Sequence, residues 1–449
     1  MNNENLKELF YFYNPWWVKD KVPPVLVAGY QRPVLKKLLS YLSLERILII
    51  KGARRTGKTT LLYQIIDTLL NQGIPSQNIF FFSFDGLRPE ENFGEIIKTY
   101  QELSKNVLPA AGTIYFFLDE IQFLPGWSSE LKRYFDRKYP LKFIVSGSAA
   151  SLIKKGAESL SGRTVEEVIT PFTFYEYLNY RLRDSKIQRI IDHYRQQSIF
   201  SRMPSRDELI PYETQIKIIW REYLKKGGFP HLFGIEEEII WKKLLQEDVI
   251  EKVIYRDLIE LFGVEKPRTL EKLFLYLASH SSEILNISNI ANSLKLSRQY
   301  TEKYLNYLKH ACLVFTLETY AGSIEKRIRK GEKSYLVDPG LLQLTGTVEI
   351  GKICETVISQ RLFSSGAKIY WWHNKYEVDL VLAQQENIFP IEVKYRESIK
   401  PEDLKGVIKF LEIYQQSRGF LITKDLLEEK TLSEKNIFCI PAWLFTLLV

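Results

Sequence analysis

One run of eight residues near the N-terminus restricts the possible folds of this chain more than any other feature. Residues 52–59 read Gly-Ala-Arg-Arg-Thr-Gly-Lys-Thr and match the pattern G-x-x-x-x-G-K-[ST] at every fixed position. The run follows the apolar residues 47–50 and precedes a segment with helical character. In this context the pattern is typical of a loop that wraps phosphate groups, and a Gly-rich turn is the simpler alternative. The pattern predicts binding of a nucleoside triphosphate.

We expect this loop to hold phosphate through its backbone. Glycine lets the chain curl until successive N–H groups face phosphate oxygens, and the start of the next helix adds the positive end of its dipole. Lys58 would then reach the β- and γ-phosphates of ATP, and the Thr59 hydroxyl would bind Mg²⁺. The expected ATP-binding residues are Gly52, Ala53, Arg54, Arg55, Thr56, Gly57, Lys58, Thr59 and Thr60.

Two carboxylates provide the second half of a hydrolytic site. The apolar run at 114–118 ends in Asp119 and Glu120, and open α/β sheets bind ligands at the carboxyl ends of their strands. We expect Asp119 to hold Mg²⁺ and Glu120 to activate water, since a pocket that only binds nucleotide needs no adjacent base. Without the phosphate loop, an Asp-Glu pair would more simply mark a helix start.

Two further side chains are candidates for the same site. Ser146 ends the next expected strand, where it could bond the γ-phosphate or the attacking water, although a Ser there is also a common turn former. Arg163 could be an arginine finger that supplies positive charge from its own or a neighbouring subunit, the latter through oligomerisation. An ordinary surface arginine is the alternative.

Composition narrows the class of protein. Of the 449 residues, 45% are hydrophobic and 26% charged, and no apolar stretch reaches the roughly 18 residues that a membrane-spanning helix needs. The N-terminus does not resemble a secretion signal and the three cysteines lie far apart, so we expect a cytoplasmic protein without disulfides or zinc.

An aromatic cluster at residues 11–17 could indicate membrane-surface binding, but its sparse basic flanks favour packing against the ATPase body.

Five segments are expected along the chain. Apolar strands at 47–50, 79–84, 113–118 and 142–146 alternate with amphipathic stretches, which predicts a parallel α/β sheet covered by helices. From Ser159 to Glu260 the pattern turns helical, with a polar loop or hinge at Gln196–Pro211. The segments are an N-terminal aromatic segment (1–30), a P-loop ATPase core (31–170), a helical lid (171–265), a winged helix-turn-helix (266–345) and an α/β domain (346–449).

Several motifs together resemble a known family. The runs GARRTGKTTLL, FIVSGSAASL, ESLSGR and PFTFYEYL are similar to the AAA-type ATPase domain of a prokaryotic, archaeal-type family. Members of that family carry a winged helix and a C-terminal domain of unknown function. The resemblance implies an ASCE-type P-loop sheet in which the strand bearing Ser146 lies between the strands that end at Gly52 and Asp119. It leaves the biological task of the family open.

Residues 266–342 predict three helices followed by two strands, a winged-helix pattern. Ser288 and Ser297 are expected N-caps, and the third helix should place Tyr300 on its packed side and Thr301 on its polar side. The polar side and a basic tip at 325–330 would suit DNA, while bracing contacts between proteins are the alternative. The candidate DNA contacts are Arg298, Gln299, Lys303, Asn306, Lys326, Arg327, Arg329 and Lys330.

Charge is concentrated in the same region. The whole chain has a formal net charge of +8, and residues 266–333 hold twelve Lys or Arg against six Asp or Glu. A basic excess of this size favours polyanionic partners such as DNA without identifying one.

A second constellation lies near the C-terminus. Residues 377–382 and 390–394 predict a β-hairpin with alternating faces. If its turn is centred between residues 385 and 386, Asp379 lies opposite Glu392 and Glu377 lies opposite Lys394, with all four on one face. Opposed carboxylates repel one another, so the arrangement is costly unless a cation bridges them.

A divalent metal, Mg²⁺ or Mn²⁺, is the predicted bridging cation. Glu355, on a predicted helix at 351–362, could supply a further carboxylate to Asp379 and Glu392, and Lys394 could orient water or neutralise phosphate charge. The set resembles the PD-(D/E)xK nuclease core, with Val378 in place of the nominal proline. A charged outer face in an inactive scaffold is the alternative, and a shift of one residue in register would move Asp379 to the other face.

Two functions therefore remain open. The first is an ATP-hydrolysing protein that acts on DNA. In this protein the nucleotide state repositions the helical and winged-helix parts, and the metal-dependent nuclease-like domain is either active or inactive in DNA cleavage. The second is an ATP-regulated switch or scaffold whose winged helix and inactive nuclease-like domain contact other proteins. Both predict ATP hydrolysis, and they differ on nucleic acid.

Overall fold

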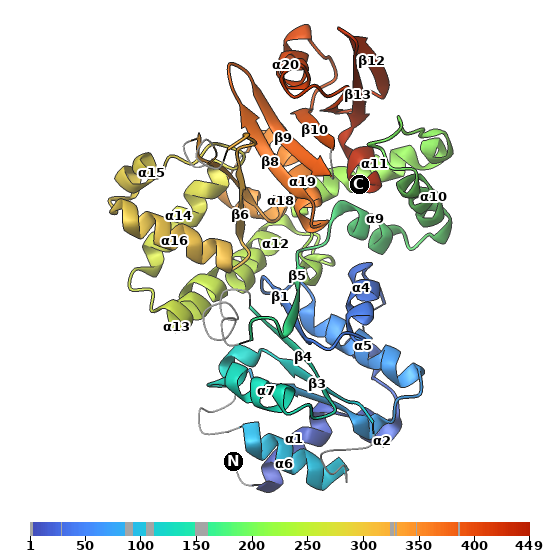
Figure 1. The fold of residues 1–449 in the computed structure, drawn as a ribbon, viewed down its shortest axis with the longest axis vertical. Coiled ribbons are helices and arrows are strands. Elements are labelled where there is room, and N and C mark those ends of the chain that lie inside the picture. Colours follow the sequence, from blue (N-terminus) through green and yellow to red (C-terminus); the bar gives the residue numbers. More distant parts are fainter. Residues whose placement is uncertain are drawn as a thin grey trace. The chain divides into compact units, whose positions relative to one another are not determined.

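The computed structural model describes the chain as two compact units, whose elements are drawn in Figure 1. Unit 1 consists of Met1–Ile169 and Asp257–Gly263, and unit 2 consists of Thr170–Arg256 and Val264–Val449. The residues that the structure describes are 3–27, 29–85, 93–104, 112–148, 160–323, 327, 330–346, 348–384 and 387–449.

Unit 1 is built on a five-stranded parallel sheet (Figure 1). Its strand order is β2-β3-β4-β1-β5. Since β4 lies between β1 and β3, the strand order that the family resemblance implied is confirmed. The inner strands are almost continuously apolar, as expected for a parallel sheet buried on both faces. The strands are β1 (Ile47–Gly52), β2 (Ile79–Ser83), β3 (Ile114–Asp119), β4 (Leu141–Ser148) and β5 (Thr164–Ile169).

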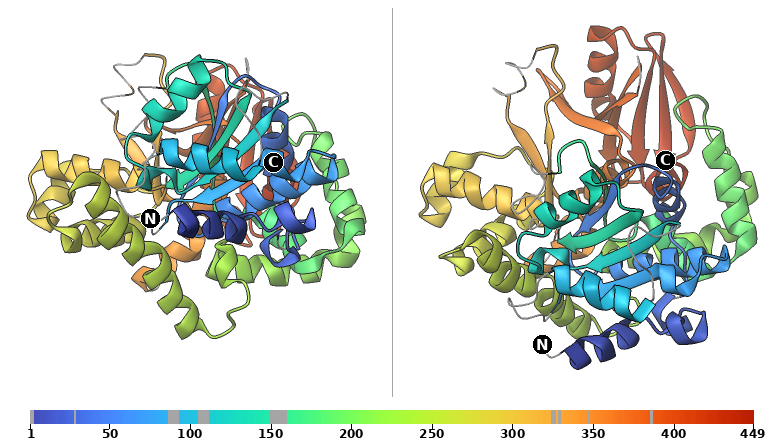
Figure 2. Two further views of the ribbon diagram at one scale, coloured as in Figure 1. Left: turned by 90° about the horizontal axis from the view of Figure 1, so that it is seen from below. Right: turned by 60° about the horizontal axis from the view of Figure 1, so that its bottom comes forward.

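Helix α5 (Lys58–Asn71) begins directly after the predicted phosphate loop. It buries Leu61, Leu62, Ile65 and Ile66, whose spacing of three to four residues forms one apolar face. Helices α1 and α6, dark blue and cyan in Figure 2, pack against each other. The other helices described in unit 1 are α1 (Asn3–Tyr13), α2 (Trp16–Lys19), α3 (Pro24–Val27), α4 (Val34–Tyr41), α6 (Phe93–Ser104), α7 (Trp127–Asp136) and α13 (Leu258–Phe262).

The N-terminal aromatic segment covers the outer edge of β2. The Asn14 side chain accepts a hydrogen bond from the Phe81 N–H at 2.6 Å and donates one to the Phe81 carbonyl at 2.9 Å. The indoles of Trp16 and Trp17 both donate to the Ile79 carbonyl at 3.0 Å. An edge strand would otherwise expose these backbone groups. The predicted packing of this segment against the ATPase body is confirmed.

Strand β5 corrects one expectation, because its residues fall in the region that was predicted to be helical from Ser159 onward. β5 forms the other edge of the sheet beside β1. Its two outward carboxylates pair with lysines of unit 1, Glu166 with Lys51 and Glu167 with Lys37. Charged side chains are common on edge strands, where they discourage further strand pairing, and they hid the strand in the sequence.

Unit 2 begins with the predicted helical region. Two glycines divide it: α11 ends at Lys226, and Gly227 has a φ of 69°. A Cβ on Gly227 would lie 1.9 Å from Asp338 Oδ1, and Asp338 accepts a hydrogen bond from the Gly228 N–H at 2.6 Å. The helices are α9 (Phe174–Leu182), α10 (Ser185–Gln196), α11 (Glu213–Lys226) and α12 (Glu238–Leu245), followed by π-helical turns at Gln246–Glu251 and Val253–Asp257. The predicted loop at Gln196–Pro211 runs into a 3-10 helix, Asp207–Tyr212.

Three helices and a two-stranded antiparallel ladder follow, in the predicted order. They are α14 (Pro267–Ser279), α15 (Ile287–Leu294), α16 (Arg298–His310), β6 (Val314–Glu318) and β7 (Glu332–Leu336). Ser297 caps α16 as expected, but Asn286 rather than Ser288 caps α15. On α16 the expected faces are exchanged at two positions. Thr301 is buried, with its hydroxyl bonded to the Ser297 carbonyl at 3.1 Å, and Tyr300 is exposed.

The C-terminal part of unit 2 is a six-stranded mixed sheet of order β12-β13-β11-β10-β9-β8 (Figure 1). Strands β9 and β10 form the predicted hairpin, and Leu380 pairs with Ile391, so Asp379 and Glu392 are the next residues along the two strands. The elements are α18 (Pro339–Leu342), α19 (Ile350–Ser364), β8 (Lys368–His373), β9 (Glu377–Gln384), β10 (Asn387–Lys394), α20 (Lys405–Ile413), β11 (Arg418–Thr423), β12 (Glu428–Leu432), β13 (Lys435–Pro441) and α21 (Ala442–Leu448).

Replacing Asn14 with alanine should destabilise unit 1. The change leaves the buried N–H and carbonyl of Phe81 without their partner, at a cost of about 2 to 4 kcal/mol in the free energy of unfolding. Urea denaturation measures it. The control is Asn71→Ala, which removes an exposed hydrogen bond to Asp67 and should cost less than about 0.5 kcal/mol. Equal effects of the two changes would contradict the proposed edge protection.

Candidate functional site

The predicted phosphate loop connects β1 to α5 in a fixed conformation. Arg55 and Gly57 both have positive φ, 63° and 91°, so the chain turns sharply twice before the helix begins. A Cβ on Gly52 would lie 2.2 Å from the Ile169 carbonyl oxygen of β5, so the loop can leave the sheet here only with glycine. The Thr56 hydroxyl donates to the Ala53 carbonyl at 3.0 Å and closes the turn.

Lys58 is the first residue of α5 and is buried against the loop. Its Nζ donates to the carbonyls of Gly52 at 3.2 Å and Ala53 at 3.0 Å. Arg32, from the segment before α4, donates to the Thr56 carbonyl at 3.1 Å and so also holds the loop in place. The loop therefore carries a lysine ammonium at the helix start, where a phosphate-binding loop needs positive charge.

Asp119 is the side chain on which the phosphate loop and two strands converge. The Thr59 hydroxyl of α5 donates to its Oδ2 at 2.8 Å, and the Ser146 hydroxyl of β4 donates to its Oδ1. Burial, and then the charge of Glu120, raise the pKa of Asp119, while Ser146, Thr59 and the Lys58 charge act in the opposite direction. The raised pKa indicates a carboxylate that lacks a strong positive partner.

Oxygen donors of this kind fit Mg²⁺. The Thr59 hydroxyl and the Asp119 carboxylate already face each other at hydrogen-bond distance, one at the helix start and one at the end of β3, and hard divalent cations prefer hydroxyl, carboxylate and phosphate oxygens. These two residues are the ones that would hold the ion. Ser146 is brought to the same carboxylate, so three predicted residues meet at one point.

Glu120 follows Asp119 in a left-handed backbone conformation with φ 50°. This turn separates the side chain of Glu120 from that of its neighbour, and the Gln122 amide donates to Glu120 Oε2. Gln122 is buried, and its role in orienting Glu120 was missed by the sequence reasoning. Glu120 is half-buried, so its carboxylate is available to a water molecule.

Arg54 makes a contact that the sequence reasoning also missed. Its guanidinium binds Asp257 with two hydrogen bonds, Nε to Oδ2 at 2.6 Å and Nη2 to Oδ1 at 2.5 Å. Asp257 is 5% exposed and starts the short segment Asp257–Gly263 that belongs to unit 1, although the chain on both sides of it belongs to unit 2. No sequence pattern could reveal this pair because 203 residues separate its members.

Arg163 lies at the other end of β1 from the phosphate loop. Its carbonyl accepts a hydrogen bond from the N–H of Ile47, the first residue of β1, and its guanidinium binds Asp136 at 2.6 and 3.1 Å. Six strand residues, about 20 Å, separate this end from the loop. Arg163 therefore does not reach the loop of its own chain, and a role in a neighbouring subunit stays a prediction.

The second constellation forms an acidic cluster in unit 2, with Glu355 on α19, Glu377 and Asp379 on β9, and Glu392 and Lys394 on β10. Glu392 Oε2 accepts the Asp379 N–H at 3.3 Å, and Asp379 Oδ2 accepts the Val393 N–H at 2.9 Å. Lys394 Nζ lies 2.5 Å from Glu392 Oε1 and 4.0 Å from Asp379 Oδ2. The structure brings the predicted set together.

A residue that was not predicted, Lys333 of β7, occupies this cluster. Its Nζ lies 3.7 Å from Glu355 Oε1 and 3.6 Å from Asp379 Oδ1, and it also pairs with Glu377. Glu377 and Lys394, which were placed opposite each other in the predicted hairpin, each pair with another residue: Glu377 with Lys333, and Lys394 with Glu392. Nothing in the sequence around Lys333 distinguishes it from the other cations of its basic region.

Burial and mutual repulsion shift the pKa values of the side chains in the cluster. Burial and the charge of Asp379 raise the pKa of Glu355 to about 7 and that of Glu392 to about 8, although Lys333 and Lys394 counteract this. Burial would lower the pKa of Lys333, but the charges of Glu355, Asp379 and Glu377 outweigh burial and raise it. An ammonium group already lies among the carboxylates that were predicted to bind metal.

This arrangement does not fit a divalent metal. Within the described part of the chain, no group of three or more His, Cys, Asp or Glu side chains is arranged to hold a metal ion. At the acidic cluster the reason is visible, since Lys333 lies between Glu355 and Asp379. The predicted metal site at Glu355, Asp379 and Glu392 is not supported by the structure.

The predicted nucleic-acid contacts on α16 are exposed to different degrees. Arg298 is paired with Glu302 at 3.0 Å, Gln299 and Asn306 are exposed, and the Lys303 ammonium lies 5.6 Å from the centre of the Tyr300 ring. A groove of about 570 Å³ runs along this helix and is lined by Arg298, Asn306, Lys309 and Lys330, among others.

The basic tip between β6 and β7 is described only in part. Arg327 donates to the Ala321 carbonyl at 3.1 Å, and its guanidinium stacks over Tyr370 at 5.3 Å. Lys330 donates to the His373 carbonyl. These two cations therefore contact their own unit. Lys326 and Arg329 lie outside the described residues.

No helix in the described ranges is both long enough and apolar enough to cross a membrane.

The chain matches three family models, and the first of them agrees with the fold of unit 1. Residues 44–178 match the AAA domain family. Residues 218–348 and 350–445 match two families that are each described as a domain of unknown function, DUF8612 and DUF4143. A solved structure of AMPPCP-bound DnaA from Aquifex aeolicus aligns at 17% identity over 62% of this chain and 86% of that chain, with a TM-score of 0.25.

Full-length relatives carry no functional description. An uncharacterized protein of Haemophilus influenzae is 26% identical over 91% of this chain and 97% of its own length. An uncharacterized protein of Methanocaldococcus jannaschii is 27% identical over 90% of this chain and 88% of its own length. The match to the AAA domain, together with the strand order and the phosphate loop, shows that unit 1 has an AAA-type P-loop ATPase fold.

Proposed function

We propose that this protein binds and hydrolyses ATP with Mg²⁺ and uses the nucleotide state to control a contact with DNA. The observation that carries the first part is the convergence on Asp119. A phosphate-loop hydroxyl and a strand hydroxyl both bond this carboxylate, and a second carboxylate, Glu120, follows it at the end of the same buried strand.

Each residue has a separate task in this proposal. The loop backbone and Lys58 bind the β- and γ-phosphates, and Thr59 and Asp119 hold the cation. Mg²⁺, when bound, neutralises charge on the phosphate oxygens. Glu120, oriented by Gln122, accepts a proton from the attacking water, and Ser146 orients Asp119 or the γ-phosphate.

A connection from nucleotide to the rest of the chain is supported by the Arg54–Asp257 pair. Arg54 belongs to the phosphate loop, and Asp257 is the last residue of the π-helical turn Val253–Asp257, part of the helical run that begins with α12. A bidentate pair has one preferred geometry. If the loop moves when ATP binds or is hydrolysed, Asp257 would therefore move with it. The proposal is that this pair transmits the nucleotide state.

The proposed DNA contact is made by α16. α16 carries exposed polar and cationic side chains beside a groove of about 570 Å³, which is the surface a recognition helix would use in a winged helix. The basic excess of residues 266–333 favours a polyanion. Function in the cytoplasm, and oligomers that use Arg163 in trans, remain parts of this proposal.

The alternative is an ATP-regulated scaffold with protein partners. One observation favours it: Lys333 fills the acidic cluster that a nuclease would need for metal. DNA cutting is therefore not part of the proposed function, and the two candidates differ only in whether α16 binds DNA or protein.

The ATP site is tested by two substitutions with different expected effects. Lys58→Ala should abolish binding of a fluorescent ATP analogue, because the loop loses its only ammonium at the helix start. Glu120→Gln should keep nucleotide affinity and lower kcat by about 100-fold or more, because the proton acceptor is lost. Phosphate release and nucleotide binding are measured on the same preparations. Parent-like turnover of Glu120→Gln would remove Glu120 from this role.

Coupling through the Arg54–Asp257 pair is tested with Asp257→Asn, which keeps the shape of the side chain and removes its charge. ATP affinity should stay within about threefold of the parent, while the difference in protease sensitivity of unit 2 between the ATP-bound and ADP-bound protein should be lost. Glu166→Gln, which breaks the surface pair with Lys51, is the control and should keep the difference. If Asp257→Asn also keeps it, the pair does not transmit the nucleotide state.

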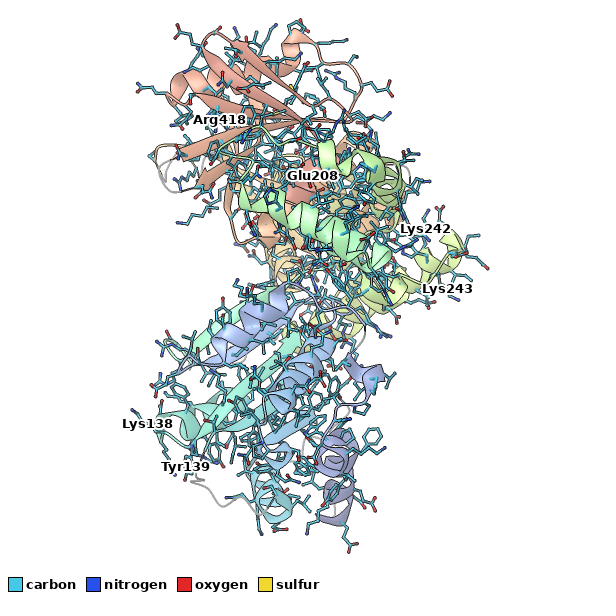
Figure 3. All side chains as sticks on the ribbon, turned by 90° about the vertical axis from the view of Figure 1, so that its right-hand side faces the viewer. Lys138, Tyr139, Glu208, Lys242, Lys243 and Arg418 are labelled. Atoms are coloured by element: carbon cyan, nitrogen blue, oxygen red, sulfur yellow. The ribbon has the colours of Figure 1, made fainter. Side chains whose placement is uncertain are left out.

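The DNA contact is tested by reversing charge on α16. Arg298→Glu combined with Lys303→Glu should lower affinity for duplex DNA and reduce the slope of log K against log salt by about 2, since each phosphate contact contributes about 0.9. Lys242→Glu with Lys243→Glu on α12, both labelled in Figure 3, is the control, because it reverses the same number of charges on a different helix, where each lysine pairs with a glutamate four residues away. An unchanged slope in the α16 variant would favour the scaffold.

A further inference from the structure

We propose that Lys333 is the permanent cation of the acidic cluster in unit 2, and that its ammonium group excludes divalent metal from a sheet that otherwise has the side chains of a nuclease. The C-terminal domain is then a non-cutting module whose acidic cluster is neutralised by a lysine of β7, in the segment before it. This inference is independent of the ATPase function, since none of the residues involved belongs to unit 1.

The ammonium group of Lys333 occupies the position that a bridging metal ion would need. Lys333 Nζ lies within 4 Å of carboxylate oxygens of Glu355, Asp379 and Glu377, which come from a helix and a strand on different segments of the chain. Mg²⁺ binds its oxygen ligands at about 2.1 Å and Ca²⁺ at about 2.4 Å. An ion that bound Glu355 and Asp379 together would take the position of the ammonium group, so the two cations cannot share the cluster.

Charge repulsion also disfavours a divalent ion in this cluster. A divalent ion held by Asp379 would lie about 4 Å from an ammonium group in a poorly hydrated environment, where like charges repel strongly. Lys394 adds a second ammonium group, 2.5 Å from Glu392 Oε1. The cluster thus has four carboxylates and two lysine ammonium groups within ion-pair distance of them, so part of the negative charge is already balanced by the protein.

Lys333 is also fixed in place. It is 2% exposed, and β7 is held on both edges: Lys333 pairs with Leu317 of β6 on one side and forms a bridge with Ile284 on the other. The ammonium also lies 5.8 Å from the centre of the Trp371 ring. Withdrawing the side chain would leave Glu355 and Asp379 buried without a counter-charge, which is strongly unfavourable.

A lysine here also explains why opposed carboxylates are tolerated. Asp379 and Glu392 are neighbours across the β9–β10 hairpin and are both buried, at 8% and 7% exposure. Such a pair destabilises a sheet unless a cation compensates it. Lys333 and Lys394 supply that compensation from the protein itself, and a metal ion is not needed for the fold.

Mn²⁺ binding to the full-length protein without nucleotide tests the proposal, with free Mn²⁺ measured by electron paramagnetic resonance. The parent and Asp379→Ala should bind Mn²⁺ equally, because the cluster takes none. Lys333→Met, which keeps an unbranched apolar side chain and removes the ammonium group, should gain one site with at least about tenfold tighter binding than the parent. Asp379→Ala in the Lys333→Met background should remove that site. Lys333→Arg, which keeps the positive charge, should behave as the parent.

Thermal unfolding gives a second readout. The rise in Tm on adding Mn²⁺ should be larger for Lys333→Met than for the parent, and it should be the same for the parent as for Asp379→Ala, since a metal bound only to the native state stabilises it. Asp379-dependent Mn²⁺ binding by the parent would overturn the proposal, and so would a folded Lys333→Met protein without the new site. If Lys333→Met does not fold, the comparison of the parent with Asp379→Ala decides alone: equal binding supports the proposal and a difference refutes it.

Discussion

The carboxylate of Asp119 is the interaction on which the nucleotide site depends. It receives a hydroxyl from the helix that follows the phosphate loop and a hydroxyl from the neighbouring strand β4. This is possible only because β4 lies between β1 and β3, which brings Ser146 next to Asp119. Strand order, loop conformation and the position of Glu120 are therefore linked through one side chain.

Buried charge is organised differently in the two units. In unit 1 the burial of Asp119 raises its pKa and leaves a carboxylate that gains from a bound cation. In unit 2 the acidic cluster has its cations already, from Lys333 and Lys394. The same type of side chain, a buried carboxylate at the end of a strand, thus prepares for a ligand in one place and stabilises the fold in the other.

The sequence revealed the features that depend on local pattern. The phosphate loop, the strand ending in Asp119 and the β9–β10 hairpin are each encoded by adjacent residues. The register that places Asp379 next to Glu392 is the one expected for a turn centred between residues 385 and 386. β5 was missed because its adjacent residues Glu166 and Glu167 interrupt the apolar run by which the other strands were recognised. Arg54–Asp257 and Lys333–Glu355 were missed because long-range ion pairs leave no periodic signal in one sequence.

Titration of a non-hydrolysable ATP analogue by calorimetry, with and without Mg²⁺, tests the central claim most directly. The account predicts that Mg²⁺ raises the affinity of the parent by at least about tenfold and has no effect on Asp119→Asn, because that change removes the charged ligand of the ion. An equal Mg²⁺ effect in both proteins, or no nucleotide binding by the parent, would contradict it.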